Sequence, residues 1–169
     1  MMVGGPVFSW RYWPYFELAL TEILDLAGDA QAAGVAGVLL APVSYQALTA
    51  DDVFGLYEDV TAILSVPLVV YDNPGTTHFT FTPDLYQAIA ALSNVASIKI
   101  PGVPPTARKA AAHVASLREI LPPQLSVGVS GDVFGATGLS AGCDVWYSAI
   151  GGTLPKPRST GESWVMTAR

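Results

Sequence analysis

Val95-Ala96-Ser97-Ile98-Lys99-Ile100-Pro101-Gly102 is a short apolar stretch that ends in two turn-forming residues, a pattern typical of a buried β-strand. Lys99 stands inside this stretch, and only one cationic residue, Arg11, precedes it in the chain. A lysine in an apolar strand either extends its amine to water or has a functional role in its buried position. Burial disfavours the ammonium form and leaves an amine that can attack a carbonyl group. Both interpretations are open from this residue alone.

Similar apolar stretches recur along the chain, and longer segments with helical spacing separate them. The predicted strands are 35–42, 66–71, 95–100, 125–130 and 144–150. The predicted helices are 16–33, 50–64, 82–92, 106–121 and 133–141, with Thr49 and Thr82 as candidate N-caps. Strands that are apolar throughout and alternate with helices pair in parallel, with both faces of the sheet covered. We therefore predict an α/β fold with about five parallel strands and intervening helices.

Two parallel architectures accommodate this pattern. The strands either complete an open, doubly wound sheet or form part of a (β/α)8 barrel, which typically takes about 250 residues. Both architectures place functional residues at the C-terminal ends of the strands, and Tyr71, Lys99 and Ser130 all lie at or near such ends. Periodicity alone does not choose between the two architectures.

Length and composition limit the class of protein. With 169 residues, of which 51% are hydrophobic and 13% charged, the chain has the composition of one well-buried globular domain. The net charge of −6 and the lack of a basic cluster argue against nucleic acid and membrane as partners. A single cysteine and no recognisable secretion signal are typical of a cytoplasmic protein. The isolated His78 and His113 have no metal-ligand spacing, so we expect no metal.

Other residues near the strand ends allow simpler interpretations. We predict that Asp132 caps the helix that follows it, and that Cys143 is a small core residue rather than a nucleophile. Tyr147 and Ser148 end the last predicted strand, where they either line a pocket or pack in the core. The glycines between 128 and 138 match no phosphate-binding fingerprint, which disfavours a small flavodoxin-like binding domain.

An ordered set of motifs resembles the dihydrodipicolinate synthase/N-acetylneuraminate lyase family of class I Schiff-base aldolases. Members carry Tyr-Asn-x-Pro-(Gly/Ala) at one strand end and Ile-Lys in the next strand, similar to Tyr71-Asp72-Asn73-Pro74-Gly75 and Ile98-Lys99. Ser130-Gly131-Asp132 and Gly142-Cys143-Asp144 add to the resemblance, which extends over about residues 17–152. The resemblance implies a partial (β/α)8 TIM barrel, of which this chain supplies roughly the second half.

The same resemblance implies a lyase or aldolase that forms a Schiff base with pyruvate or another 2-oxo acid. Lys99 is then the residue that attacks the ketone, and Tyr71 the residue that transfers protons. The expected substrate contacts are Gly131, Thr76, Tyr147 and Ser148. No cofactor is implied, and members of the family are commonly homo-oligomers.

The sequence departs from the family pattern at several points. Asp72 replaces the usual asparagine, and we predict a turn residue that bonds to backbone amides. Thr76 stands where synthases often carry a carboxylate-binding arginine, so the lyase or aldolase members are the better comparison. The family's Gly-Thr-Thr-Gly-Glu-type turn does not occur in the sequence. The alternative is therefore a non-catalytic, truncated member that lacks a complete active site.

The two ends of the chain lose the strand and helix patterns. We predict an irregular N-terminal segment over residues 1–15, a partial TIM-barrel domain over 16–152 and an irregular C-terminal tail over 153–169. No helix is predicted after the last strand. Because a barrel segment exposes parallel strand edges, we expect the chain to associate.

Overall fold

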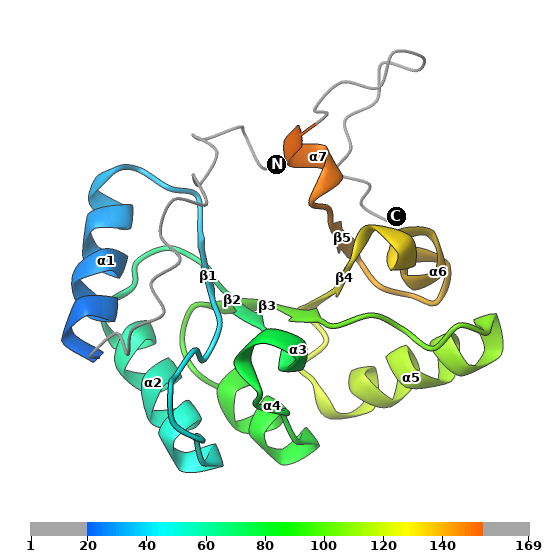
Figure 1. Cartoon of the computed structure of the whole chain (residues 1–169), viewed down its shortest axis with the longest axis horizontal. Helices are drawn as coiled ribbons and strands as arrows, with labels where there is room; N and C mark the ends of the chain where they lie inside the picture. The colour runs from blue at the N-terminus through cyan, green and yellow to red at the C-terminus, as the bar shows by residue number, and fades with distance from the viewer. Residues whose placement is uncertain (1–19, 154–169) are drawn as a thin grey trace. The chain divides into compact units, whose positions relative to one another are not determined.

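The computed structural model describes residues 20–153, which divide into two compact units (Figure 1). The first unit comprises the described residues up to Ala96, and the second begins at Ser97. Both units are built from parallel strands and helices, and strand pairs follow the order of the chain. The predicted α/β fold class is confirmed, with five strands among residues 20–153.

In the first unit, β1 (Val38–Leu40) and β2 (Leu68–Tyr71) run parallel, with Val38 opposite Leu68. The helices of this unit are α1 (Leu20–Ala32), α2 (Ala50–Ile63), α3 (Pro74–Thr77) and α4 (Pro83–Ala90). The first two residues of β3 (Val95–Ile100) also belong to this unit.

Local sequence determines where α2 and α4 begin. Thr49 forms a capping box with Asp52: the Asp52 N–H donates to Thr49 Oγ1 at 3.2 Å, and the Thr49 N–H donates to the Asp52 carboxylate at 2.8 Å. The Leu85 N–H donates to Thr82 Oγ1 at 3.3 Å, and Pro83 occupies the first turn, where no helical N–H bond is needed. Both predicted N-caps are confirmed.

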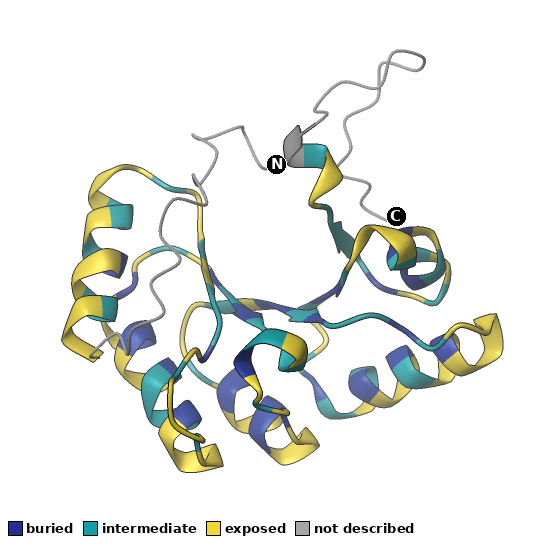
Figure 2. Ribbon diagram, viewed as in Figure 1, coloured by how far each residue is buried: buried dark blue, intermediate teal, exposed yellow. Residues whose placement is uncertain are grey.

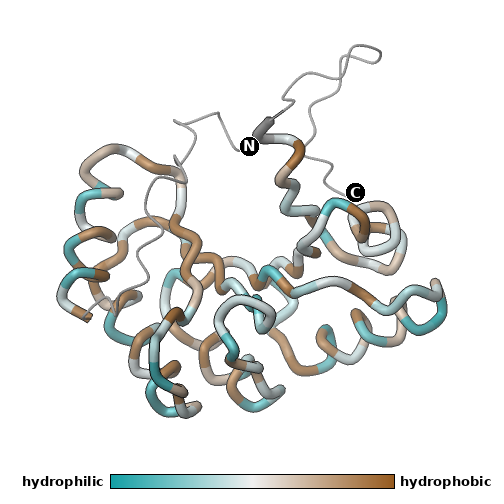
Figure 3. The backbone as a smooth tube through the Cα atoms, in the orientation of Figure 1, coloured by the Kyte–Doolittle hydropathy of each residue, from teal (hydrophilic) through white to brown (hydrophobic). Residues whose placement is uncertain are grey.

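The core of the first unit lies between β2 and the inner faces of α2 and α4. Its fully buried side chains are Val53, Tyr57, Val60, Leu68, Val70 and Ile89. The Phe81 ring stacks on Tyr86 with centroids 5.3 Å apart and meets Tyr57 edge-on. Figure 2 shows buried residues on the helix faces that turn toward the strands, and Figure 3 shows that the strands are largely hydrophobic.

The second unit contains the parallel strands β3, β4 (Ser126–Ser130) and β5 (Val145–Tyr147). In the register of these strands, Lys99 lies opposite Gly128, and Gly128 lies opposite Val145. The helical elements are α5 (Ala107–Ile120), the 3₁₀ turn η1 (Asp132–Phe134), α6 (Gly135–Ser140) and α7 (Ile150–Thr153).

The two faces of this sheet differ in composition. Side chains alternate along a strand, so Ile98, Ile100, Val127 and Val129 share one buried face, which α6 covers at β4 and β5. Gly138 lets α6 approach Val129, because a Cβ at this position would overlap the valine side chain. The opposite face carries Ser97, Lys99, Gly128 and Tyr147. Polar residues are therefore concentrated on the face away from α6.

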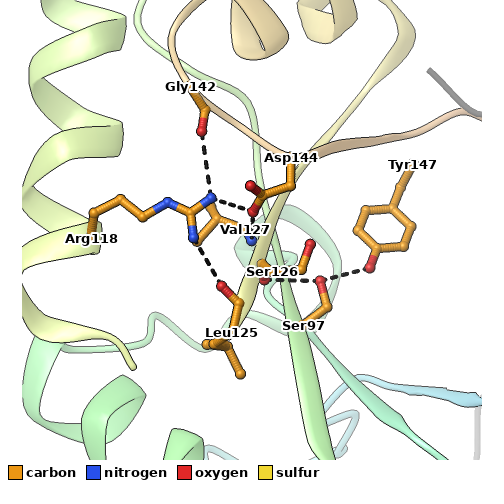
Figure 4. A network of polar contacts seen from close by, with 8 residues as sticks. All are labelled: Ser97, Arg118, Leu125, Ser126, Val127, Gly142, Asp144 and Tyr147. Atoms are coloured by element: carbon orange, nitrogen blue, oxygen red, sulfur yellow. Dashed lines mark hydrogen bonds and ion pairs between the residues drawn. The ribbon is translucent and has the colours of Figure 1, made fainter. Parts of the chain in front are cut away.

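A polar network joins the N-terminal ends of β4 and β5 to α5 (Figure 4). Arg118 of α5 donates to the Leu125 carbonyl at 2.9 Å and pairs with the Asp144 carboxylate. Asp144 also accepts the Val127 N–H at 2.7 Å. One arginine and one aspartate therefore bind the segments that enter two adjacent strands.

The largest differences from the predicted elements follow the strands of the second unit. The predicted strand 144–150 ends at Tyr147 and α7 begins at Ile150, so the expectation of no helix after the last strand is wrong. The Ile150 N–H donates to Asp132 at 3.1 Å, and the Gly151 N–H donates to Ser148 Oγ at 2.9 Å, which turns the chain out of the sheet. The predicted helix 133–141 is divided into η1 and α6. In the first unit, α3 lies where no helix is predicted.

Part of the prediction falls on undescribed residues. The segment 1–15, the start of the first predicted helix and residues 154–169 lie outside the described range. Within residues 20–153, no helix has the length and hydrophobicity to cross a bilayer. The same residues contain no group of three or more His, Cys, Asp or Glu side chains that could hold a metal ion.

Candidate active site

Lys99 lies near the end of β3, on the face of the sheet opposite to the one that α6 covers. Its neighbours along the strand, Ile98 and Ile100, point to the buried face, whereas Lys99 itself is half-buried. Strand alternation alone therefore directs the lysine side chain away from the apolar core.

The side chain of Tyr147, from β5, lies beside Lys99. The Nζ atom of Lys99 is 5.7 Å from the centre of the Tyr147 ring and lies over its face, within the range of a cation–π contact. The Tyr147 hydroxyl donates to Ser97 Oγ at 2.8 Å, and Ser97 Oγ donates to the Ser126 carbonyl at 3.0 Å (Figure 4). Ser97 is buried and stands two residues before Lys99 on the same strand face. These bonds hold the distal end of the tyrosine ring on the strand that carries the lysine.

Gly128 makes the position of the Tyr147 ring possible. This residue of β4 lies opposite Lys99, and a Cβ there would overlap the Tyr147 ring and a Val145 methyl group. A glycine inside a strand commonly marks a place where another group approaches the backbone closely. The tyrosine side chain therefore crosses β4 at Gly128 and reaches β3.

Burial raises the pKa of Tyr147, and the hydrogen bond with Ser97 opposes part of that rise. The phenol consequently stays protonated at neutral pH and remains a donor to Ser97. Lys99 therefore meets the uncharged aromatic face of Tyr147 rather than a phenolate.

Asp132 joins the segments that follow β4 and β5. Its carboxylate accepts the Ser148 hydroxyl at 2.9 Å and the N–H groups of Ala149 and Ile150, each at 3.1 Å. The prediction that Asp132 caps the helix directly after it is wrong, because its carboxylate binds the start of α7 instead. Gly131 precedes it with a φ of 84°, a conformation that glycine adopts without strain. Gly131 thus precedes Asp132 in the chain, and Ser148 is hydrogen-bonded to the Asp132 carboxylate.

Tyr71 and Thr76 are linked through Asn73 in the first unit. The Asn73 side-chain amide donates to the Tyr71 hydroxyl at 3.2 Å and to Thr76 Oγ1 at 3.0 Å. Thr76 lies in α3, whose first turn is closed by the Thr76 N–H donating to the Asn73 carbonyl at 2.9 Å. The Tyr-Asp-Asn-Pro-Gly segment therefore folds so that one asparagine orients both predicted site residues.

Asp72 has a different role from the predicted one. It does not act as a turn residue bonded to backbone amides: its Oδ2 accepts the Tyr86 hydroxyl at 2.5 Å in the core between β2 and α4. The side chain is 6% exposed, and its Oδ1 has no hydrogen-bond partner among the described residues. Burial raises the pKa of Asp72, and the Tyr86 hydrogen bond opposes that rise. The aspartate faces away from Tyr71, because successive residues of an extended chain point to opposite sides.

Cys143 is fully buried just before β5. Burial raises its pKa to about 11, so the nucleophilic thiolate is scarce at neutral pH. The prediction of a small core residue is confirmed.

The structure thus groups the predicted residues in three sets. Lys99 lies with Tyr147, Gly131 and Ser148 meet at Asp132, and Tyr71 and Thr76 meet at Asn73. Tyr71 belongs to the first compact unit and Lys99 to the second. Ser97, Gly128 and Asn73 also belong to these sets, although none of the three is among the predicted site residues. Two signals in the sequence indicate them: a serine and a glycine interrupt otherwise apolar strands, and an asparagine follows a strand end.

Comparison with solved structures defines the class of protein. The chain is similar to the dihydrodipicolinate synthase from Agrobacterium tumefaciens str. C58, with a TM-score of 0.77 and 40% identity over 82% of this chain and 46% of that chain. Dihydrodipicolinate synthase from Thermotoga maritima gives a TM-score of 0.68 at 25% identity, over 82% of this chain and 46% of that one. The predicted partial TIM barrel is confirmed, in preference to an open doubly wound sheet.

The family follows from the sequence match. The chain belongs to the dihydrodipicolinate synthetase family, whose model matches residues 18–156. A curated relative, 4-hydroxy-tetrahydrodipicolinate synthase from Syntrophobacter fumaroxidans, is 32% identical over 78 residues, which are 46% of this chain and 27% of that protein. The chain spans about half the length of the solved structures that it matches.

Proposed function

We propose that the chain is a Schiff-base-forming lyase or aldolase that acts on pyruvate or another 2-oxo acid, with Lys99 as the nucleophile. The observation that carries the proposal is the placement of Lys99: half-buried, near the C-terminal end of β3, on the polar face of the sheet. In TIM barrels this end of the strands carries the catalytic groups. Family membership supports carbon–carbon lyase chemistry, because the curated relatives are named as synthases of 4-hydroxy-tetrahydrodipicolinate.

In the proposed reaction, the neutral amine of Lys99 attacks the ketone carbon of the substrate, and the carbinolamine loses water to form an iminium ion. The iminium withdraws electrons, so a carbanion at C3 is stabilised as an enamine while the bond at C3 forms or breaks. Tyr71 transfers protons to and from the carbinolamine. The Asn73 amide, which donates to the Tyr71 hydroxyl, orients the phenol for that role.

Four residues are proposed as substrate contacts: Gly131, Thr76, Tyr147 and Ser148. The Thr76 hydroxyl is held by Asn73 and offers a hydrogen bond, not a charge, to the substrate. A neutral contact at this position favours lyase or aldolase chemistry over condensation with a substrate whose carboxylate needs a bidentate arginine.

Reductive trapping tests the proposal. The protein is incubated with pyruvate and sodium cyanoborohydride, and peptides are then analysed by mass spectrometry. We expect a pyruvyl adduct on Lys99 that is absent in Lys99→Ala. The matched control is Lys109→Ala, which removes an exposed lysine of the same unit on α5 and leaves the adduct unchanged.

A second variant tests the role of Tyr71. Because Tyr71→Phe removes the proton-transfer group, we expect slower adduct formation on Lys99, by about a hundredfold. If well-folded wild-type protein forms no adduct, the alternative holds and the chain is a non-catalytic member of the family.

The proposal includes a homo-oligomeric protein of the cytoplasm. Among the described residues, β1 is an edge strand that pairs with β2 on one side, and an unpaired strand edge presents N–H and C=O groups with which another chain can pair. Size-exclusion chromatography with light scattering measures the assembly, and a stable monomer at micromolar concentration contradicts this part of the proposal.

A further inference from the structure

The contacts of Lys99 within the second unit point to a specific role for Tyr147. We infer that Tyr147 is a positioning residue: its ring holds Lys99 Nζ over one aromatic face, so that the amine is aligned for attack and the resulting iminium lies against the same face. This inference rests on the proposed Schiff-base function and assigns the groups that organise its nucleophile.

Three adjacent strands each contribute one element of this arrangement. Tyr147 of β5 supplies the ring, Gly128 of β4 provides the space that it crosses, and Ser97 of β3 accepts its hydroxyl at 2.8 Å. Ser97 is in turn fixed by donating to the Ser126 carbonyl at 3.0 Å. A ring held at its distal end has few orientations, and Lys99, two residues after Ser97 on β3, has its amine over that ring.

The chemistry of the aromatic face fits the charge of the nitrogen during the reaction. A ring face attracts a cation through its quadrupole, and Lys99 Nζ lies 5.7 Å from the ring centre. When the amine has attacked a ketone and water has left, the positive charge remains on the same nitrogen. The contact therefore persists from the ammonium to the iminium. It increases the rate of attack because it aligns the nitrogen with the bound ketone.

The reactivity of Lys99 toward a small acylating reagent tests the contact without any substrate. Protein is labelled with limiting acetic anhydride, and peptide mass spectrometry gives the ratio of Lys99 to Lys109 labelling, with the exposed Lys109 as internal reference. Removing the ring face in Tyr147→Leu deprives the ammonium of its cation–π contact, so we expect the ratio to rise about two- to fivefold. In Tyr147→Phe the face is retained, and the ratio stays near that of the wild type.

The labelling ratios of the three proteins either support or overturn the positioning role of Tyr147. An equal ratio in wild type, Tyr147→Leu and Tyr147→Phe overturns the inference, as does a rise in Tyr147→Phe equal to that in Tyr147→Leu. If Tyr147→Leu fails to fold, Tyr147→Met replaces it, because methionine fills irregular space without an aromatic face.

Trapping with pyruvate separates this inference from the proposed function. In Tyr147→Leu we expect the trapping rate at saturating pyruvate to fall by about tenfold, because the amine is no longer aligned with the bound ketone. Tyr147→Phe restores most of the rate. A normal rate in Tyr147→Leu refutes the positioning role and leaves the function intact, whereas no adduct in the wild type refutes the function while the labelling ratio still reports on the contact.

Discussion

The two ends of the strands in the second unit differ in what their polar side chains bind. At the N-terminal ends of β4 and β5, Arg118 and Asp144 bind backbone groups as well as each other. At the C-terminal ends, Ser148 donates to Asp132, whose carboxylate also accepts the N–H groups of the exposed residues Ala149 and Ile150 after β5. At the N-terminal ends the polar side chains bind backbone groups of the strands and of the residues that lead into them, whereas at the C-terminal ends they bind one another and the exposed segment that follows β5. The difference matches the division in TIM barrels between a stabilising end and a functional end.

The first unit shows the same difference. Before β2, the Gln31 side chain accepts the Ser65 N–H at 2.6 Å, and the Asn94 amide donates to the Leu64 carbonyl at 2.6 Å. After β2, the Asn73 amide binds two side chains, those of Tyr71 and Thr76. Each unit, taken by itself, therefore separates polar residues that secure the chain from those that orient a candidate site.

The largest expected effect comes from removing the aspartate at the N-terminal ends. Asp144→Ala takes the partner from Arg118 and leaves the Val127 N–H, in a fully buried residue, without its acceptor. We expect the free energy of unfolding to fall by about 1–3 kcal/mol, measured by urea denaturation. Labelling of Lys99 relative to Lys109 stays unchanged in the folded variant.

Asp132→Ala is the matched variant at the C-terminal ends. The N–H groups that it releases belong to the exposed residues Ala149 and Ile150 and can bind water, so we expect a smaller loss of stability than in Asp144→Ala. Equal losses in the two variants contradict the proposed difference between the two ends.

Asp72 is an exception to this division between the two ends of the strands. It follows β2, but its side chain belongs to the core. Its pKa is raised in the folded chain, so folding favours the protonated carboxyl group. Its contribution to stability is fully present below the ordinary Asp pKa of about 3.9 and is lost as the pH rises through the raised value. We expect Asp72→Asn, which cannot ionise, to show a weaker decrease of unfolding free energy as the pH rises above about 4.

Urea denaturation over a series of pH values measures this dependence. Tyr86→Phe removes the hydrogen bond that opposes the pKa rise, so it extends the loss of stability to higher pH. Identical pH profiles for wild type and Asp72→Asn would show that the carboxyl group is solvated and not part of the core.

The smallest expected effect concerns the hydrogen bond that fixes the Tyr147 ring. Ser97→Ala and Tyr147→Phe each remove one partner of the same bond, and a double-mutant cycle isolates their coupling. We expect a coupling of about 0.5–1.5 kcal/mol in the free energy of unfolding. Strictly additive losses would mean that the bond does not form in solution.

Much of the fold could be predicted because it depends on local patterns. Apolar stretches flanked by turn residues located all five strands, and Thr49 and Thr82 marked two helix starts through bonds within one turn. Prediction failed at Asp132 and Asp72, whose partners lie 18 and 14 residues away in Ile150 and Tyr86. No periodic pattern identifies such partners.

The sequence by itself determined the class of fold, the family and the position of Lys99 in a strand, because these follow from periodicity and from motifs of adjacent residues. Only the tertiary structure decided what surrounds that lysine. Tyr147 is 50 residues from Ser97 in the chain, and the two meet because parallel pairing of β3, β4 and β5 aligns Lys99 with Gly128 and leaves space for a ring to cross. Strand register is a property of the assembled sheet, and it determines which side chains become neighbours.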